Sequence, residues 1–285
     1  MKSFKKIFSL ILSVMFIVLC FAGCSAAGEA EEISDKTMLI AYTQENAPFI
    51  YTDSESGELT GFDVELFEKI FNNIKNENEN YKFIQVEEGY KIGEDAAYVD
   101  DEGNEYIAYV MIGGVQKNTG SFNQDYTVTQ NVIDNRIITV TAADSKIATY
   151  ADLQGATAGI VTEQAKTAFD KNAAIKNGLK GLNEYADAKT ALDALNNGTV
   201  DAVIIDEFSF NVLENKDNYK VLDSELDTIS YVYALSKGDW YVDSINEAIH
   251  ELQSPEYNDA DEFTPIVEKY FHYDASNFEY NAVNK

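Results

Sequence analysis

Hydrophobic positions in the first quarter of the chain form strand-like runs and one helical stripe. Residues 37–43 predict a short strand, and the next segment predicts a β-hairpin that turns at Ser56-Gly57. Apolar residues then recur at helical spacing after Asp63, which is a candidate N-cap. This stripe consists of Phe67, Ile70, Phe71 and Ile74. Another strand is predicted over 81–88.

The pattern weakens between Gly89 and Gly114, where no helical face can be traced. Two strands on either side of residues 101–104 would fit this stretch. These four residues, Asp-Glu-Gly-Asn, carry oxygen ligands but lack the spacing of a calcium-binding loop. We therefore expect a solvated turn there.

From Arg136 onward, strands and helices alternate. Strands are predicted over 136–142 and 199–206, with a short helix and a strand over 149–161. Thr162 is a candidate cap for one helix, and Gly198 stands where another helix should stop. The apolar side of that second helix is Ala188, Ala191, Leu192 and Leu195. Because strand–helix–strand units require a crossover, we predict an α/β fold with a parallel sheet.

The chain closes with one more predicted strand and two amphipathic helices. The strand covers 230–237, and the helices cover 240–253 and 261–271. The first helix aligns Val242, Ile245, Ile249 and Leu252 on one side.

The N-terminus has the composition of a secretory signal. Residues 1–23 begin with lysines, continue with an apolar run and end on small residues before Cys24. The closing FAGC resembles a bacterial lipoprotein box, which implies acylation of Cys24, and residues 24–33 would form a flexible tether. A single membrane-spanning anchor is the alternative. Cys20 would leave with the signal, so the mature chain would have no cysteine pair for a disulfide.

The charge balance narrows the possible partners. The chain has 21 basic and 49 acidic residues, which gives a formal net charge of -28. Such a chain does not attract nucleic acid or an anionic membrane surface through its electrostatic field. At long range, its acidity favours cationic over anionic ligands.

A pair of carboxylates follows the buried strand predicted over 199–206. Asp206 ends this strand, and Glu207 comes next. A buried carboxylate is costly unless a partner compensates it. The partner of Asp206 could be a ligand, but Asp206 could also cap a helix beginning near Glu207 or pair with a nearby lysine.

Several motifs resemble the amino-acid-type (family 3) solute-binding proteins of ABC importers, in the same order. They include GELTGFDVEL after the first strand, ADLQGATAGIVTEQAK, and NGTVDAVIIDE. The resemblance implies a two-lobed periplasmic-binding-protein-like fold of type II, with two crossover strands and a ligand cleft between the lobes. Lobe 1 would comprise residues 34–135 and 229–285, and lobe 2 residues 136–228.

The resemblance also implies where a ligand is held. Asp206 matches the position whose carboxylate receives the ligand's ammonium group. Further contacts are expected from Thr43, Asn46, Phe49, Tyr90, Gly113, Gly114, Gln116, Lys117, Thr162, Glu163 and Gln164. Four residues depart from the family pattern: Thr43 replaces an acid, Asn46 replaces an aromatic residue, and Glu163-Gln164 replaces Gly-Thr.

The largest departure is the missing carboxylate clamp. The family grips an α-carboxylate with an arginine, and the matching position, near Gly120, is not arginine. Arg136 is the only arginine of the chain and matches a crossover strand, which leaves Lys117 as a possible substitute. Glu163 would repel a ligand carboxylate. These residues suggest a ligand that has a positive group and no free α-carboxylate, such as a polyamine or an amino-acid amide.

The sequence therefore indicates a substrate-binding lipoprotein of an ABC transporter, anchored by lipid on the extracytoplasmic face of the cell membrane. It would be a monomer that binds a small amine or amino-acid-like solute and docks on a membrane permease, with no cofactor, metal or nucleic acid. The alternatives are a surface lipoprotein that reuses the fold without transport, and a dehydratase-like enzyme. No nucleophile elbow occurs, and His250 and His272 lie in the C-terminal helices.

Overall fold

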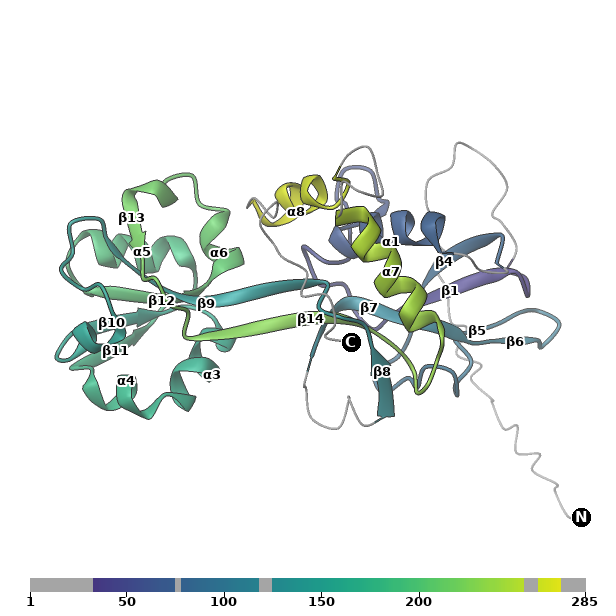
Figure 1. The fold of residues 1–285 in the computed structure, drawn as a ribbon, viewed down its shortest axis with the longest axis horizontal. Coiled ribbons are helices and arrows are strands. Elements are labelled where there is room, and N and C mark those ends of the chain that lie inside the picture. The colour runs from purple at the N-terminus through teal and green to yellow at the C-terminus, as the bar shows by residue number, and fades with distance from the viewer. Residues whose placement is uncertain (1–32, 75–77, 118–124, 254–260, 273–285) are drawn as a thin grey trace, which may run out of the picture.

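The computed structural model describes residues 33–74, 78–117, 125–253 and 261–272, which form two lobes (Figure 1). Two long strands pass from one lobe to the other. Each has ten residues, and they are β9 (Ile133–Ala142) and β14 (Asp227–Ser236). Within the described residues, no helix is long and apolar enough to cross a membrane.

Lobe 1 is built on a sheet whose central strands are parallel. β1 (Thr37–Tyr42) lies between β4 (Asn80–Gln85) and β7 (Ala108–Gln116), and both pair with it in parallel. Every residue of β1 is buried, because this strand is covered on both faces. The remaining strands are β2 (Tyr51–Thr52), β3 (Leu59–Thr60), β5 (Tyr98–Val99), β6 (Glu105–Tyr106) and β8 (Tyr126–Val128).

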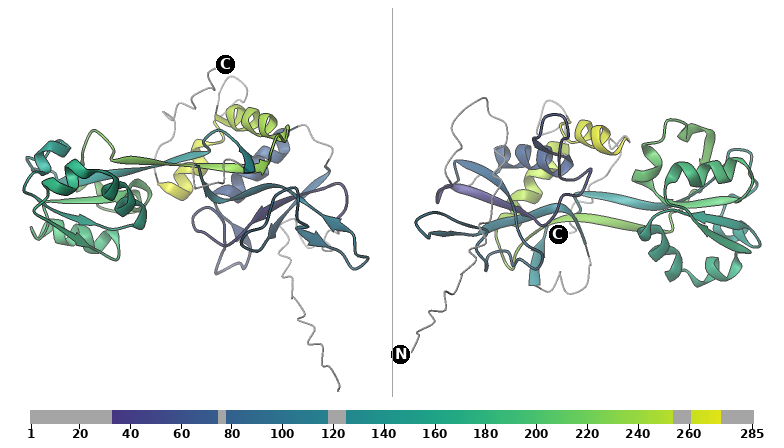
Figure 2. Two further views of the ribbon diagram at one scale, coloured as in Figure 1. Left: turned by 90° about the horizontal axis from the view of Figure 1, so that it is seen from below. Right: turned by 180° about the vertical axis from the view of Figure 1, so that it is seen from behind.

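Three helices cover one face of the lobe 1 sheet. They are α1 (Phe62–Asn73), α7 (Tyr241–Gln253) and α8 (Thr264–Phe271). Each presents an apolar stripe to the sheet, and the predicted stripes of α1 and α7 are confirmed by the burial of Phe67, Ile70, Ile245 and Ile249. The helices group together on the same side of the sheet in Figure 2.

Lobe 2 contains the predicted parallel sheet. β10 (Thr157–Ile160) pairs in parallel with β11 (Gly181–Glu184) and with β12 (Ala202–Asp206), and β12 then pairs antiparallel with β9. A short strand, β13 (Tyr219–Val221), also joins β9. The helical segments are η1 (Tyr150–Leu153), α3 (Glu163–Lys171), α4 (Ala173–Gly178), α5 (Ala188–Asn196), α6 (Glu207–Asn211) and η2 (Lys216–Asn218).

The two crossover strands make one continuous sheet of both lobes. Its order is β11-β10-β12-β9-β14-β7-β1-β4, so β9 and β14 stand at the junction. The lobe boundaries expected near 136 and 229 fall inside β9 and β14. Lobe 2 is therefore inserted between two segments of lobe 1.

Two local predictions can be compared directly with the structure. Thr162 does cap α3, since its hydroxyl accepts a hydrogen bond from the Ala165 amide at 3.2 Å. The prediction that Asp63 caps α1 is wrong, because Gly61 occupies the N-cap position. Asp63 lies inside the first turn of α1 and is buried there.

Candidate functional site

The carboxyl ends of the parallel strands bring the predicted lobe 2 residues to one edge. Ile160 of β10 is in register with Ile204 of β12, and the two strands run in the same direction. Thr162–Gln164 come one residue after the end of β10, and Asp206 ends β12. Thr162 is half-buried at the start of α3, while Glu163 and Gln164 are exposed. These residues therefore lie at the carboxyl ends of neighbouring strands, which is where α/β sheets bind ligands.

Asp206 is 6% exposed and belongs to two hydrogen-bonded arrangements. Its Oδ1 accepts a hydrogen bond from the Ser209 amide at 3.0 Å, so Asp206 is the N-cap of α6. The same oxygen accepts a hydrogen bond from Nδ2 of Asn135 at 3.1 Å. Among the described residues, Oδ2 accepts no hydrogen bond and no lysine or arginine pairs with the carboxylate. One oxygen of a nearly buried carboxylate is thus left for another partner.

The neighbouring carboxylate, Glu207, has a cationic partner. Arg136 donates to it through Nε at 2.9 Å and through a second guanidinium nitrogen, in a two-point contact. Arg136 is the only arginine of the chain, and its guanidinium pairs with Glu207 at the start of α6.

A second group of predicted residues meets at the end of β7 in lobe 1. Gly113 and Gly114 have φ values of 103° and 74°, which side chains other than glycine rarely adopt. The Asn46 amide donates to the Gly113 carbonyl at 3.0 Å. A Cβ on Gly114 would lie 2.6 Å from Asn46 Nδ2 and 2.8 Å from a ring carbon of Phe49. These four residues therefore form one tightly packed unit.

The Asp63 carboxylate binds the backbone amides of this glycine pair. Its Oδ2 accepts hydrogen bonds from the Gly113 and Gly114 amides at 2.8 and 3.0 Å, and Oδ1 accepts one from the Tyr233 hydroxyl at 3.1 Å. Burial raises the pKa of the Asp63 carboxyl to about 6, although the three donors oppose the rise. The sequence predicted a helix-capping role for Asp63, because helical spacing indicates where a helix begins but not which distant backbone amides a side chain contacts.

The other predicted lobe 1 residues have separate environments. Thr43 follows β1, and its carbonyl accepts a hydrogen bond from Gln85. Gln116 ends β7 opposite Tyr231. Lys117 is exposed and donates to Asn131 Oδ1 at 2.9 Å.

Tyr90 stands apart from the other predicted contacts. Its hydroxyl accepts from the Ala108 amide at 3.0 Å, at the beginning of β7, and donates to the Asp95 carbonyl. Cys24 lies outside the described residues.

The carboxyl ends of β12 in lobe 2 and of β7 in lobe 1 both reach the crossover strands near their middle. In the sheet register, Asp206 is opposite Ile137 of β9. Gln116 is opposite Tyr231 of β14, which is itself opposite Ile133 of β9. The carboxyl ends of β12 and β7 therefore reach the crossover about four residues apart, or roughly 13 Å along a strand.

Sequence reasoning missed Asn135 as a member of this site. It is 5% exposed and lies on β9 in phase with the buried Ile133 and Ile137, while Arg136 between them is exposed. A polar residue at an apolar position of an alternating strand was the available signal.

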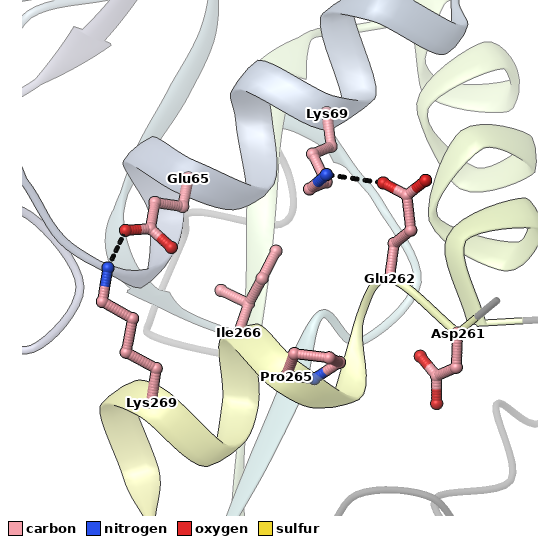
Figure 3. A pocket seen from close by; sticks show the side chains of 7 residues that line it. All are labelled: Glu65, Lys69, Asp261, Glu262, Pro265, Ile266 and Lys269. Atoms are coloured by element: carbon pink, nitrogen blue, oxygen red, sulfur yellow. Dashed lines mark hydrogen bonds and ion pairs between the residues drawn. The ribbon is translucent and has the colours of Figure 1, made fainter.

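A surface groove of about 340 Å³ lies elsewhere, within lobe 1. Ion pairs between Lys69 and Glu262 and between Glu65 and Lys269 border it, and Ile266 lies between them (Figure 3). None of the predicted site residues lines this groove. Among the described residues, no cluster of three or more histidine, cysteine or carboxylate side chains could hold a metal ion.

Several solved structures that resemble this chain are substrate-binding proteins or domains of ABC transporters. The chain resembles the second substrate-binding domain of a proposed amino acid ABC transporter from Streptococcus pneumoniae, with 25% identity, a TM-score of 0.57, and coverage of 82% of this chain and 99% of that one. It resembles a polar amino acid ABC uptake transporter substrate-binding protein from Streptococcus thermophilus, with 22% identity, a TM-score of 0.63, and coverage of 84% and 87%.

A third similar structure is the L-cystine solute receptor of Neisseria gonorrhoeae in its unliganded open conformation. Identity is 19%, the TM-score is 0.65, and the match covers 84% of this chain and 94% of that one. No protein-family profile matches the sequence, and no curated protein matches it. The predicted two-lobed type II fold is confirmed, as is the resemblance to amino-acid substrate-binding proteins of ABC transporters.

Proposed function

We propose that this chain, which has the fold of amino-acid substrate-binding proteins of ABC transporters, captures a small amine-bearing solute outside the cytoplasm and delivers it to a membrane permease. The observation that carries the proposal is the Asp206 carboxylate. It is nearly buried at the carboxyl edge of a parallel sheet, and no cationic side chain of the described residues compensates it. An ammonium group would supply the missing charge.

The solute that fits best has a positive group and lacks a free α-carboxylate. The guanidinium of Arg136 is occupied by Glu207, and Lys117 donates to Asn131 at 2.9 Å. The Gly113 and Gly114 amides, which could otherwise bind an anion, are both taken by Asp63. Glu163 adds a further acid at the exposed start of α3. Polyamines and amino-acid amides meet these constraints.

The membrane attachment belongs to the same proposal. Acylation at Cys24 would tether a monomer to the extracytoplasmic face of the membrane through residues 24–33. The described part of the chain begins at Ile33, which belongs to the same buried cluster of lobe 1 as Leu39 and Ala41. The tether would therefore join the protein at lobe 1.

Asp206→Asn tests the solute site. Asparagine keeps the N-cap of α6 but removes the charge. The probes are putrescine, agmatine and L-lysinamide, with L-lysine as the carboxylate-bearing comparison, in calorimetric titrations of the mature chain. We expect the wild type to bind at least one amine probe and the variant to bind it about ten- to a hundredfold more weakly, because a charge-assisted bond is lost.

The matched control is Asp201→Asn, directly before the first residue of the same strand. Asp201 Oδ2 accepts a hydrogen bond from the Thr157 amide at 2.8 Å, and an asparagine oxygen can take its place. Wild-type affinity is expected for this variant. Equal affinity of Asp206→Asn and wild type would remove Asp206 from the site. Tight binding of L-lysine that survives Lys117→Ala would refute the proposed solute class.

A further inference from the structure

The solute-binding carboxylate of lobe 2 is joined to the crossover strands by a single buried side chain. Asn135 of β9 donates from Nδ2 to Asp206 Oδ1 at 3.1 Å. Its Oδ1 accepts the Phe208 amide at 3.2 Å, at the start of α6. Both ends of the amide are therefore used, which determines its orientation.

Asn135 also lies beside the second crossover strand. In the sheet register Asn135 is opposite Ile229 of β14, and Tyr231 of β14 is opposite Ile133 of β9, so the side chains of Asn135 and Tyr231 project from the same face of the sheet. One side chain thus binds the end of β12 from β9 and lies next to β14.

Phe208 extends this connection into lobe 1. It follows Asp206 by two residues, yet its ring packs with the lobe 1 core. The ring centroid lies 4.1 Å from that of Phe271 on α8, and 6.3 Å from the nearly parallel ring of Tyr231. The segment that carries the solute-binding carboxylate is therefore anchored in both lobes.

We propose that Asn135 is a positioning residue that aims Oδ2 of Asp206 at the solute and couples solute binding there to the bending of both crossover strands. The assignment rests on the proposed function for the solute and on the contacts above for the coupling. Asn135 donates a hydrogen bond to Oδ1 of Asp206, so Oδ2 is the oxygen that is available to the solute. Any pull of an ammonium group on Asp206 reaches β9 through Asn135, and it reaches β14 through Phe208, whose ring packs against Tyr231.

The test follows lobe separation and affinity in the same molecules. Cys24→Ala removes the last cysteine of the mature chain, so Ala174→Cys on α4 and Glu247→Cys on α7 can be labelled for single-molecule energy transfer. Both positions are exposed and lie in different lobes. The probes are putrescine, agmatine and L-lysinamide.

Asn135→Leu removes every hydrogen bond of the amide. Without probe, we expect a broader distribution of lobe separations than in the wild type. With the best amine probe, we expect affinity to fall about tenfold and the probe-induced change in separation to shrink. A purely structural role would lower the melting temperature and leave affinity unchanged, which would overturn the proposal.

Two further variants keep the test decisive. Arg136→Gln is the matched control, because it breaks the adjacent, exposed pair between β9 and α6; it should resemble wild type, and an equal broadening would overturn the special role of Asn135. Tyr231→Leu removes the β14 ring against which Phe208 packs, so it should broaden the distribution with a smaller loss of affinity. If Asn135→Leu does not fold, an unchanged distribution in Tyr231→Leu overturns the coupling.

The two proposals fail in different ways. If wild type binds no amine probe, the proposed function fails, while the distributions without probe still decide whether Asn135 restrains the crossover strands. If wild type binds and Asn135→Leu matches it in both measurements, only the positioning role fails.

Discussion

Two carboxylates near the start of helices differ in how completely their oxygens are used. Asp63 has three donors for its two oxygens, from β7 and from Tyr233. Asp206 has two donors on one oxygen. A carboxylate whose two oxygens both accept hydrogen bonds positions backbone, whereas one with an unused oxygen can receive a solute. The same residue type therefore serves structure in lobe 1 and is available for binding in lobe 2.

Asp63→Asn replaces the carboxyl with an amide of the same shape that does not ionise. Because burial raises the pKa of Asp63 to about 6, its contribution to stability is present below its unfolded pKa and is lost as the pH rises through about 6. The free energy of unfolding of wild type minus that of the variant should therefore fall by about 1 kcal/mol from pH 5 to pH 7. Urea titrations at both pH values measure it.

Asp53→Asn is the control for this measurement. The Ser56 backbone amide, with the Ser56 hydroxyl and Glu55 amide, lowers the pKa of Asp53 below 3.8. Its ionisation is complete well below pH 5, so its difference from wild type should not change over the same range. A constant or rising difference for Asp63→Asn would contradict the assigned burial.

At the scale of elements, the beginning of α1 depends on a close contact with the loop before β2. Gly61, the N-cap, has φ of 132°. The Phe62 and Asp63 amides donate to the carbonyls of Pro48 and Phe49 at 2.9 Å. The first amides of α1 are therefore satisfied by that loop, and no side chain caps the helix. This contact also places Phe49 against the glycine pair of β7.

Gly61→Ala should destabilise the protein by about 3 kcal/mol or more. A Cβ there would lie 2.3 Å from the Phe49 carbonyl oxygen, and backbone cannot move aside as a flexible side chain can. Gly57→Ala is the comparison: its φ is 73° but no atom lies within 4 Å of the new Cβ, so about 1 kcal/mol is expected. Equal midpoints in denaturant for the two variants would contradict this account.

Most elements could be predicted from periodicity, and the contacts between them could not. Alternation and helical spacing located β9, α3 and α5, and the short hairpin of β5 and β6 matches the two strands expected around 101–104. The roles of Asp63 and Asn135 depend on partners 50 and 71 residues away in sequence. Local patterns carry no information about such pairs. The motif resemblance pointed to Asp206, but not to Asn135, which donates a hydrogen bond to it.

At the scale of the whole molecule, the lobes are held by more than their two connecting strands. Phe208 enters the lobe 1 core, and Lys216 of lobe 2 donates to the His272 carbonyl at the end of α8 at 3.0 Å. Both contacts lie on the α8 side of the crossover. A turn of lobe 2 that keeps them would move the outer parts of that lobe most and Asp206 least.

The proposed lipid anchor gives a prediction for the complete chain. Labelling cells with an alkyne fatty acid should tag the wild type and Cys20→Ala, and should leave Cys24→Ala untagged, because only Cys24 follows the small-residue site. Cys20→Ala is a close control, four residues away. A wild-type protein that takes up no fatty acid would favour the membrane-spanning alternative.

The insertion of lobe 2 between two segments of lobe 1 sets an order of assembly during synthesis. Residues 133–221 contain every strand that β9 joins in lobe 2, so these can pair as soon as they leave the ribosome. β7 then has only β1 beside it, and it waits for β14, which emerges later. The half of the protein that is translated second can thus be completed first, in contrast to the usual N-to-C succession of domains.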